Sequence, residues 1–472
     1  MKKEQTPISN ISYTVIANGL SMLVGVLITL IIPKVVGILD YGYFQLYVFY
    51  SSYVGFLHFG WADGIFIRYG GDYYEKLDKP KFAGQIKSYL VIQLLLSAIV
   101  VFLAEKMSND SDKVVVFICV GLTIVLTNVK VLFMYILQAT GRIREYAVMV
   151  FLERGIYGIL LIICMYFGSN RFVDYIITCL IGIFFSVLYG MYCCKEILAA
   201  KAESFVQIKD EAKKNLSVGS KIMIANFSGM LILGIVQQFV ETKWDVETFA
   251  KVSLIIAIAN IAIGFINAVA IVLFPMLRRM ENEGRTATYY KIESLITVLF
   301  LWLLAMYYPI KELLNIWLPD YRSSFEYLVL LFPICLWEGK YSLLVNTYLK
   351  TYRKEKIIMK INIITMVISF IVTSINVNVF QNLEVTLASV VVFLALRCIM
   401  GELELGKLMG CSVIKNIFTE LVFTLAFIVV FSFLNGVFSF IIFGMLVIAY
   451  TVFAVDFSRV IRYILDRVII RK

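Results

Sequence analysis

The sequence predicts an all-α polytopic membrane protein with about 14 transmembrane helices, built as two pseudo-symmetric six-helix lobes followed by two extra helices. Three observations lead to this fold class. Fourteen apolar stretches are each long enough to cross a bilayer, the loops between them alternate between rich and poor in lysine and arginine, and short sequence matches recur at an offset of 208 to 210 residues. Each observation is taken in turn below.

The apolar stretches define the expected helices. A helix needs roughly 20 mostly apolar residues to cover a hydrocarbon core about 30 Å thick. The stretches are residues 11–32, 42–59, 86–104, 114–137, 146–167, 172–194, 218–240, 249–275, 292–308, 325–349, 357–380, 383–401, 417–434 and 437–455. Helices are expected because a backbone in lipid must satisfy its own hydrogen bonds, and the stretches lack the polar and apolar alternation of barrel strands.

The loop charges predict the orientation. The N-terminus, the even-numbered loops and the segment after the last stretch hold 31 of the 43 lysine and arginine residues, while the odd-numbered loops hold eight. Because cytoplasmic loops of membrane proteins carry an excess of basic residues, the basic side is expected to be cytoplasmic. Both the N- and C-termini are therefore predicted to lie in the cytoplasm.

The composition agrees with a membrane location. Hydrophobic residues make up 61% of the chain and charged residues 16%, whereas charged residues are about 25% of a typical soluble globular protein. The net charge of +10 would also suit a nucleic-acid binder, but the cations lie in loops where anionic lipid headgroups are found. We therefore expect a multi-pass protein of the bacterial cytoplasmic membrane, with membrane lipid and no nucleic acid as a partner.

The cysteines give no sign of a metal centre. Seven of the eight lie inside or at the edges of the apolar stretches and Cys411 lies between two of them; none has metal-ligand spacing, and they are expected to be small packing residues. No metal, cofactor or catalytic residue is expected, and the chain contains no Walker A nucleotide-binding sequence.

The domain organisation follows from the repeat. The expected parts are an N-terminal six-helix lobe at 1–194, a charged cytoplasmic linker at 195–216, a C-terminal six-helix lobe at 217–415, and two extra helices with a basic cytoplasmic tail at 416–472. The matches are Ile16-Ala17-Asn18 with Ile224-Ala225-Asn226, Arg68 with Arg278, and Lys130 with Lys340. Parallel repeats of this kind are a transporter architecture, in which the substrate site lies between the lobes.

Charges inside the membrane are the first candidate for a site. Four basic residues lie well inside the apolar stretches, away from their first few residues: Lys130, Arg154, Lys340 and Arg397. A charge at the centre of a span costs roughly 2.5 to 3.5 kcal/mol on insertion scales, so such residues usually face a protein interior or a watery cavity. Glu153 and Glu338 are the expected counter-charges, through ion pairs with Lys130 and Lys340. Because the cations outnumber these two carboxylates, we predict a cationic cavity that attracts an anion from the cytoplasm.

Aromatic and uncharged polar side chains are the second set of candidates for a binding site. Tyr43, Tyr47 and Tyr50 share one helical face of the second span and are the best candidates among its many rings for lining a polar cavity. Spans one and seven carry polar residues in equivalent places, namely Asn18 and Ser21, then Asn226 and Ser228. Such residues can equally well line a cavity or bond helix to helix.

The N-terminal region resembles a known family. The segments Gly37-Ile-Leu-Asp-Tyr-Gly-Tyr-Phe-Gln-Leu-Tyr47 and His58-Phe-Gly-Trp-Ala-Asp-Gly-Ile-Phe-Ile-Arg-Tyr-Gly-Gly71 resemble polysaccharide biosynthesis membrane proteins of the oligosaccharide (O-antigen type) flippase family. That family is part of the multidrug/oligosaccharidyl-lipid/polysaccharide exporter superfamily. The close likeness covers about the first seventy residues, and the number and grouping of spans extend a looser likeness to the whole chain.

The resemblance implies a function. It implies two lobes around a cavity that opens to each side of the membrane in turn, and a polyprenyl-diphosphate-linked oligosaccharide as the substrate, moved outward for capsule or exopolysaccharide assembly. Polysaccharide polymerases and glycosyltransferases are implied as partners. By position, Arg68, Lys130, Lys340 and Arg397 could serve as the basic cavity residues of this family. Energy would come from an ion gradient or from consumption of the product.

Two other functions remain open. A drug/cation antiporter of the same superfamily would need acidic residues in its cavity, whereas the charges inside the predicted spans are mainly basic. A membrane polysaccharide polymerase or ligase would be an enzyme with a substantial outer loop, and the longest predicted outer loop, about residues 309–324, is short for a domain.

Overall fold

The computed structural model describes residues 7–278, 280–434 and 436–454, and every regular element within these ranges is a helix. Eleven of the described helices are long and apolar enough to cross a membrane, and two shorter apolar helices lie at Gly19–Val35 and Val437–Val452. The structure therefore has the character of a multi-pass membrane protein. The N-terminal residues 1–6, the basic tail at 455–472 and Arg279 lie outside the described residues.

The chain forms two compact units. Unit 1 comprises Met1–Phe227 with Val246–Ala250, and unit 2 comprises Ser228–Asp245 with Lys251–Lys472. One long helix, α9, contributes its first part to unit 1 and its second part to unit 2. It begins inside the predicted linker 195–216, so most of that linker is helix.

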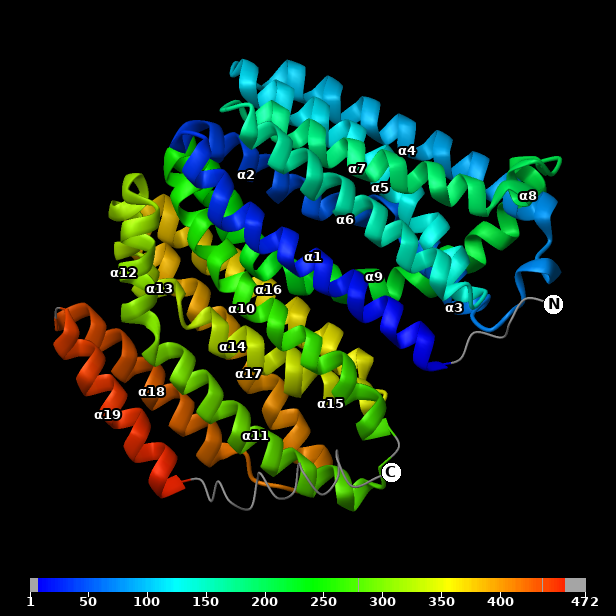
Figure 1. Ribbon diagram of the computed structural model, residues 1–472. Coiled ribbons are helices and arrows are strands. Elements are labelled where there is room, and N and C mark those ends of the chain that lie inside the picture. Colours follow the sequence, from blue (N-terminus) through cyan, green and yellow to red (C-terminus); the bar gives the residue numbers. More distant parts are fainter. Residues whose placement is uncertain (1–6, 279, 435, 455–472) are drawn as a thin grey trace. The chain divides into compact units, whose positions relative to one another are not determined.

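Unit 1 is a bundle of apolar helices. Its elements are α1 (Pro7–Val35), α2 (Ile38–Tyr53), η1 (Val54–His58), α3 (Trp61–Arg68), η2 (Tyr74–Lys76), α4 (Lys79–Met107), α5 (Ser111–Ala139), α6 (Ile143–Tyr166), α7 (Phe172–Cys193), α8 (Lys195–Leu198) and the first part of α9 (Phe205–Lys243). Helix α5 is central, because it packs against α2, α4 and α7, and α6 packs between α7 and α1 (Figure 1).

Unit 2 also consists mainly of long helices, with several short helical elements between them. Its elements are the rest of α9, α10 (Val246–Arg278), α11 (Asn282–Ala305), α12 (Tyr307–Trp317), η3 (Pro319–Glu326), α13 (Leu328–Leu331), α14 (Ile334–Lys340), the π-helical η4 (Tyr341–Asn346), α15 (Thr347–Thr351), α16 (Glu355–Ile375), the π-helical η5 (Asn376–Phe380), α17 (Leu383–Met409), α18 (Ile414–Phe433) and α19 (Val437–Ala454). Helix α17 packs against α14 and α16, while α18 and α19 pack on α11 (Figure 1).

Helix ends follow from local chemistry. Asp110 caps α5 by accepting hydrogen bonds from the backbone N–H groups of Asp112 and Lys113, at 2.9 and 3.2 Å. Asn382 caps α17 in the same way, and Gly410 ends that helix at φ +65°, a conformation that glycine adopts without strain. These capping residues lie in the gaps between the predicted apolar ranges.

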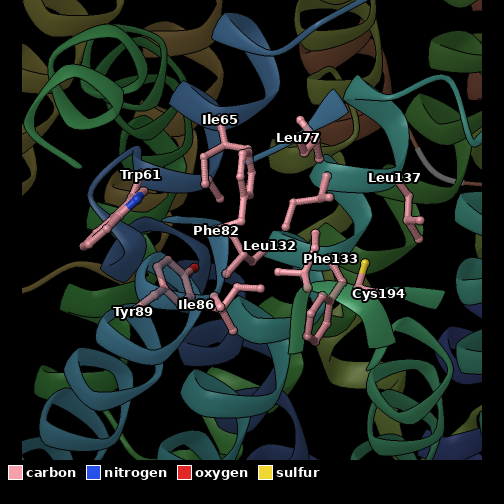
Figure 2. Close-up of a cluster of buried hydrophobic side chains, with 14 of the residues drawn as sticks. Trp61, Ile65, Leu77, Phe82, Ile86, Tyr89, Leu132, Phe133, Leu137 and Cys194 are labelled. Atoms are coloured by element: carbon pink, nitrogen blue, oxygen red, sulfur yellow. The ribbon is translucent and has the colours of Figure 1, made fainter. Parts of the chain in front are cut away.

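The connecting segments at one end of unit 1 are packed together. Trp61 and Ile65 of α3, Phe82 and Ile86 of α4, and Phe133 of α5 meet in one apolar cluster (Figure 2). Cys194 before α8 is also buried in this cluster, and burial raises the pKa of its thiol to about 12. The end of unit 1 that gathers α3, α8 and the start of α9 is therefore a packed layer.

Helices cover all fourteen predicted ranges, with the second range built from α2 and η1 and the tenth from α13 to α15. The number of helices that cross the membrane and the side on which the termini lie stay predictions. The boundaries differ in one consistent way, since α9, α11 and α17 each extend well beyond the apolar range by which they were predicted.

Candidate functional site

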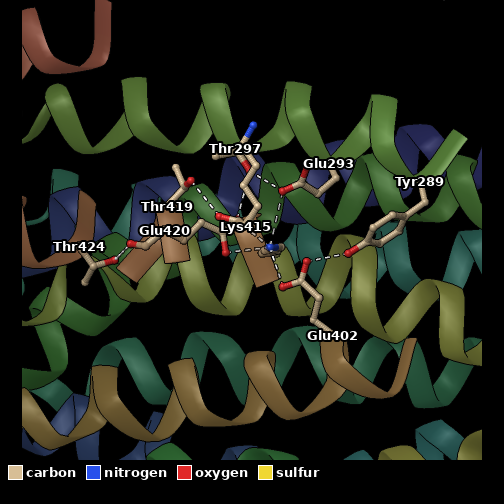
Figure 3. Close-up of polar contacts among 9 residues, drawn as sticks. Tyr289, Glu293, Thr297, Glu402, Lys415, Thr419, Glu420 and Thr424 are labelled. Carbon is tan, nitrogen blue, oxygen red and sulfur yellow. Dashed lines mark hydrogen bonds and ion pairs between the residues drawn. The ribbon is translucent and has the colours of Figure 1, made fainter. Parts of the chain in front are cut away.

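A buried charge cluster in unit 2 is the most concentrated group of ionisable side chains in the described part of the chain. Lys340, at the end of α14, has no exposed surface. Its ammonium nitrogen lies 2.8 Å from Glu402 of α17, 2.7 Å from Glu420 of α18 and 3.8 Å from Glu293 of α11. Four helices thus each supply one charge to a single point, which we name the Lys340 cluster (Figure 3).

Hydroxyl groups complete the Lys340 cluster. The hydroxyl of Tyr289 donates to Glu402 at 2.6 Å. The hydroxyl oxygen of Thr297 lies 3.2 Å from Glu293 and 3.1 Å from Glu420. Figure 3 shows these side chains converging from three helices. The cluster is therefore a connected hydrogen-bond network inside a packed unit, not a surface ion pair.

The predicted shortage of carboxylates is wrong. Glu293 and Glu420 lie inside the predicted ranges 292–308 and 417–434, and Glu402 lies one residue beyond 383–401. All three are buried beside Lys340, which therefore has an excess of negative charge around it and no surface to offer an anion in this conformation. Acidic residues within the apolar stretches were the sequence signal for this cluster.

A second network in unit 2 holds Arg397. Arg397 of α17 pairs with Glu338 of α14, so Glu338 is the counter-charge of Arg397 and not of Lys340. The guanidinium lies 4.0 Å from the centre of the Tyr341 ring, and the Tyr341 hydroxyl donates to Asn362 at 3.0 Å. Arg397 is buried, whereas the side chain of Glu338 is 28% exposed, so this pair reaches the surface through its acidic partner.

The basic residues of unit 1 lie around one carboxylate. The Lys130 ammonium of α5 lies 2.8 Å from Glu153 of α6, as predicted, and both side chains are buried. Arg154, the next residue of α6, lies 4.0 Å from the same carboxylate and keeps 39% of its side chain exposed. Two cations therefore share one anion, which leaves the group with a net charge of +1, and Arg154 is its exposed member.

Arg68 belongs to a different part of unit 1. Its guanidinium lies 2.6 Å from Glu211 of α9 and donates to the side-chain oxygen of Asn215 at 2.5 Å. Asn215 in turn donates to Gln85 of α4 at 2.8 Å. Arg68 thus ties α3 to α9 within unit 1, and the structure does not bring it together with Lys130 or Arg154.

The aromatic face of α2 is mostly interior. Tyr43 and Tyr47 are buried, and their hydroxyls bond Asp110 at 2.8 Å and Thr123 at 3.0 Å, both within unit 1. In this conformation the two rings pack against α5 and its cap, and their role in lining a polar cavity stays a prediction. Tyr50 is partly exposed and its ring contacts Phe117, at 4.7 Å between ring centres.

The predicted polar pairs of spans one and seven differ in their surroundings. Asn226 is exposed on α9 and Ser228, two residues later, is buried. Ser21 of α1 is partly exposed, and the side chain of Asn18 lies outside the described residues. Their roles in lining a cavity stay predictions.

Comparison with known proteins addresses the fold. No family model and no curated protein sequence matches the chain. Lipid II flippase MurJ, in an inward closed conformation, is similar with a TM-score of 0.67 and 15% identity, over 96% of this chain and 99% of that chain. An inward-facing multidrug resistance MATE family transporter of the MOP superfamily is similar with a TM-score of 0.58 and 14% identity, over 84% of this chain and 94% of that chain. The chain has the fold of these transporters.

A further solved structure extends the comparison. A MOP superfamily transporter from Pyrococcus furiosus, described as having a binding pocket of reverse polarity, is similar with a TM-score of 0.50 and 14% identity, over 86% of this chain and 96% of that chain. At these identities the likeness concerns the fold, so the chemistry must be argued from the residues of this chain. Those residues provide an exposed cation in unit 1 and a buried, acid-rich cluster in unit 2.

Proposed function

We propose that the protein is a flippase of the bacterial cytoplasmic membrane, which moves a polyprenyl-diphosphate-linked oligosaccharide from the inner to the outer leaflet by alternating access. The observation that carries the proposal is the fold similarity to a lipid flippase along nearly the whole of both chains, 96% and 99%. The similar MATE transporter covers less of this chain, 84%. A lipid-linked substrate is therefore favoured over a small soluble one.

Arg154 is the residue best suited to meet the diphosphate. It lies 11 residues from the start of α6, roughly 16 Å along the helix at 1.5 Å per residue, so it is far from either end. A cation at this depth is costly in lipid and usually faces a protein interior or a water-filled space. Lys130 already neutralises Glu153, so the positive charge of Arg154 remains available to an anion.

The other predicted basic residues serve the proposal less directly. Lys130, Lys340 and Arg397 are each held by a carboxylate, so their replacement would disturb packing as well as any substrate contact. Arg397 could join a substrate site if Glu338, its partly exposed partner, moved away. Polysaccharide polymerases and glycosyltransferases remain the proposed partners, because they would consume and supply such a lipid-linked oligosaccharide.

The test is transport by purified protein in proteoliposomes that contain a fluorescent polyprenyl-diphosphate oligosaccharide. We expect Arg154→Ala to lose most of the transport rate and Arg154→Lys to keep part of it, because the diphosphate needs a cation at this position. Arg144→Ala is the matched control, since Arg144 is an exposed arginine at the start of the same helix. Equal rates for wild type and Arg154→Ala would remove Arg154 from the substrate site.

Rival functions give different outcomes in the same vesicles. A drug/cation antiporter would export a cationic dye and leave the lipid-linked oligosaccharide in place. A polymerase or ligase would lengthen or transfer the oligosaccharide, which gel analysis of the lipid fraction would reveal. Either result, without movement of the labelled lipid, would overturn the proposal.

A further inference from the structure

The Lys340 cluster has more negative than positive charge. One ammonium group faces three carboxylates, so the cluster would carry a net charge of −2 if every group were ionised. The side chains of Lys340 and Glu402 are 0% exposed, that of Glu420 is 1% exposed and that of Glu293 is 7% exposed. An uncompensated charge at such a site costs several kcal/mol, and a buried carboxylate avoids this cost by binding a proton.

In the described part of the chain, the groups shown to interact electrostatically with the cluster do not supply the missing positive charge. They include Tyr289 of α11, Cys398 of α17 and Tyr450 of α19, which are neutral when protonated. Arg397, beside Cys398, is paired with Glu338. Lys291 is two residues from Glu293 on α11, and residues at this spacing do not face each other on a helix. At least one carboxyl group of the cluster must therefore hold a proton.

The contacts identify the carboxyl group that binds this proton. Glu402 accepts hydrogen bonds from Lys340 and Tyr289, and Glu420 lies 2.7 Å from the ammonium, so these two carboxyl groups make the closest contacts with the positive charge. Glu293 is 3.8 Å from the ammonium, so a negative charge on its carboxyl group would be the least compensated of the three.

Thr297 joins Glu293 to Glu420, and the longer distance of Glu293 from the ammonium decides which of the two holds the proton. The Thr297 hydroxyl has one hydrogen but lies within hydrogen-bond distance of both Glu293 and Glu420. If Thr297 donates to Glu420, its contact with Glu293 requires a hydrogen on the Glu293 carboxyl group. A protonated Glu293 therefore completes a chain in which Glu293 donates to Thr297 and Thr297 donates to Glu420.

A metal ion does not fit this cluster. The ammonium of Lys340 occupies the point on which the carboxylates converge. Within the described ranges, no group of three or more histidine, cysteine, aspartate or glutamate side chains is arranged to hold a metal ion. The exchangeable charge at this site is the proton.

We propose that the Lys340 cluster is a proton-binding site, that Glu293 gains and loses the proton, and that this exchange couples the transport cycle to protons. Loss of the proton leaves a net charge of −2 among α11, α14, α17 and α18, which favours a conformation that admits water to the cluster. The π-helical turn Tyr341–Asn346 directly follows Lys340, and π-helical turns are frequent at functional sites. Only the coupling part of the proposal rests on the proposed transport function.

The proton is tested first, without a transport assay. Infrared spectra of the purified full-length protein at pH 7 should contain the carbonyl stretch of a protonated carboxyl group, and Glu293→Gln should lose intensity there. Glu153→Gln is the matched control, because Glu153 pairs closely with Lys130 and is expected to be ionised. A wild-type spectrum without this band, or one that Glu293→Gln leaves unchanged, would overturn the proposal.

Stability gives a second measurement on the same samples. Glutamine has the size and neutral charge of a protonated glutamate, so Glu293→Gln should fold and melt near the wild-type temperature at pH 7. The melting temperature of the wild type should fall as the pH is raised and Glu293 loses its proton, whereas that of Glu293→Gln should fall less. A variant that melts far below the wild type at pH 7 would indicate an ionised Glu293.

Coupling is tested in the proteoliposomes. A pH gradient should accelerate transport by the wild type and leave Glu293→Gln unaffected. A wild-type transport rate that does not change with the pH gradient would overturn the coupling. An absence of any transport by the wild type would overturn the proposed function, but it would not affect the infrared result. Arg154→Ala should show the opposite pattern, with the infrared band retained and transport lost.

Discussion

Lys130 and Lys340 lie at equivalent places in the sequence repeat, yet they differ in their surroundings. Lys130 shares one carboxylate with Arg154, so its group is cationic. Lys340 has three carboxylates, so its group is acidic. The two lysines that the predicted repeat pairs therefore have opposite electrostatic surroundings, and the difference comes from residues on neighbouring helices.

Replacement of Lys340 should be strongly destabilising. In Lys340→Met, Glu402 and Glu420 lose their cation while buried, and breaking such a pair costs about 3 to 5 kcal/mol unless protons take its place. We expect a marked fall in the melting temperature of the purified protein in detergent. Addition of Glu402→Gln should recover part of the loss, because it removes one of the uncompensated charges.

The control for this experiment is Lys407→Met on α17. Lys407 pairs with Glu404, but this pair is largely exposed, and exposed pairs contribute little to stability. The melting temperature should be close to that of the wild type. A Lys340→Met variant as stable as Lys407→Met would show that the buried cluster does not hold unit 2 together.

The sequence revealed the cations of these groups and missed several of the anions. Lys130 with Glu153 was predictable, since both lie at one depth on consecutive helices. Glu402 was not, because hydropathy placed the end of its helix at residue 401 whereas α17 continues to Met409. The partner of Glu338 was also not predictable, because the choice between Lys340 and Arg397 depends on how α14 packs on α17.

At the scale of elements, α3 and α9 approach each other through glycines. A methyl group added at Gly219 would lie 1.9 Å from the backbone oxygen of Gly60, and one added at Gly64 would lie 2.0 Å from that of Asn215. Such small residues allow two backbones to pack in direct contact. The ion pair of Arg68 with Glu211 closes the same contact at its other end.

This contact predicts that Gly219→Ala separates α3 from α9. The added carbon meets backbone atoms that cannot rotate away, so the folded yield and the melting temperature should both fall. Gly444→Ala on α19 is the same substitution where nothing lies within 4 Å, and it should be neutral or stabilising by up to about 1 kcal/mol. Equal behaviour of the two variants would argue against the close packing.

Hydropathy located the helices but not their ends. Hydropathy measures the cost of moving a segment out of lipid. It therefore detects the apolar middle of a helix, but it does not detect a polar turn by which the same helix continues in water or against protein. Helix α11 begins at Asn282, ten residues before its predicted range, and this extension carries Tyr289 to the Lys340 cluster. Two residues of the site, Tyr289 and Glu402, lie in turns that hydropathy missed.

The last two helices are part of unit 2 and not an appendage to it. Glu420 of α18 completes the Lys340 cluster, and Phe427 packs against Phe332 and Tyr307. The sequence repeat does not include these helices, so it could not indicate that one of them supplies a charge to the site. The predicted lobe ending at residue 415 therefore lacks part of the site.

At the scale of the whole molecule, one continuous helix belongs to both units. In unit 1, Asn215 and Gly219 of α9 pack on α3. In unit 2, the backbone oxygen of Ile232 accepts a hydrogen bond from Ser369 at 2.9 Å, and Gly229 packs against Asn362. The register of α9 is therefore fixed separately on each side of Phe227.

Insertion of one alanine between Phe227 and Ser228 should disrupt the protein. It turns the second half of α9 by about 100° relative to the first, so the contacts of Asn215 and Gly219 with α3 and the contact of Val246 with Gly42, all within unit 1, cannot be kept together. We expect a lower melting temperature and loss of transport. The same insertion between Ala200 and Lys201, in the non-helical segment before α9, should be tolerated, and failure of both would trace the effect to something other than helical register.

The sharing of α9 also bears on the order in which the protein is made. Ile208 and Ala212 belong to the apolar cluster that contains Ile65 and Phe82, and Asn215 is wholly buried beside them. A ribosome that has synthesised six spans has therefore not yet released the residues that close this cluster. Until the beginning of α9 emerges, this apolar cluster lacks Ile208 and Ala212 and stays incomplete.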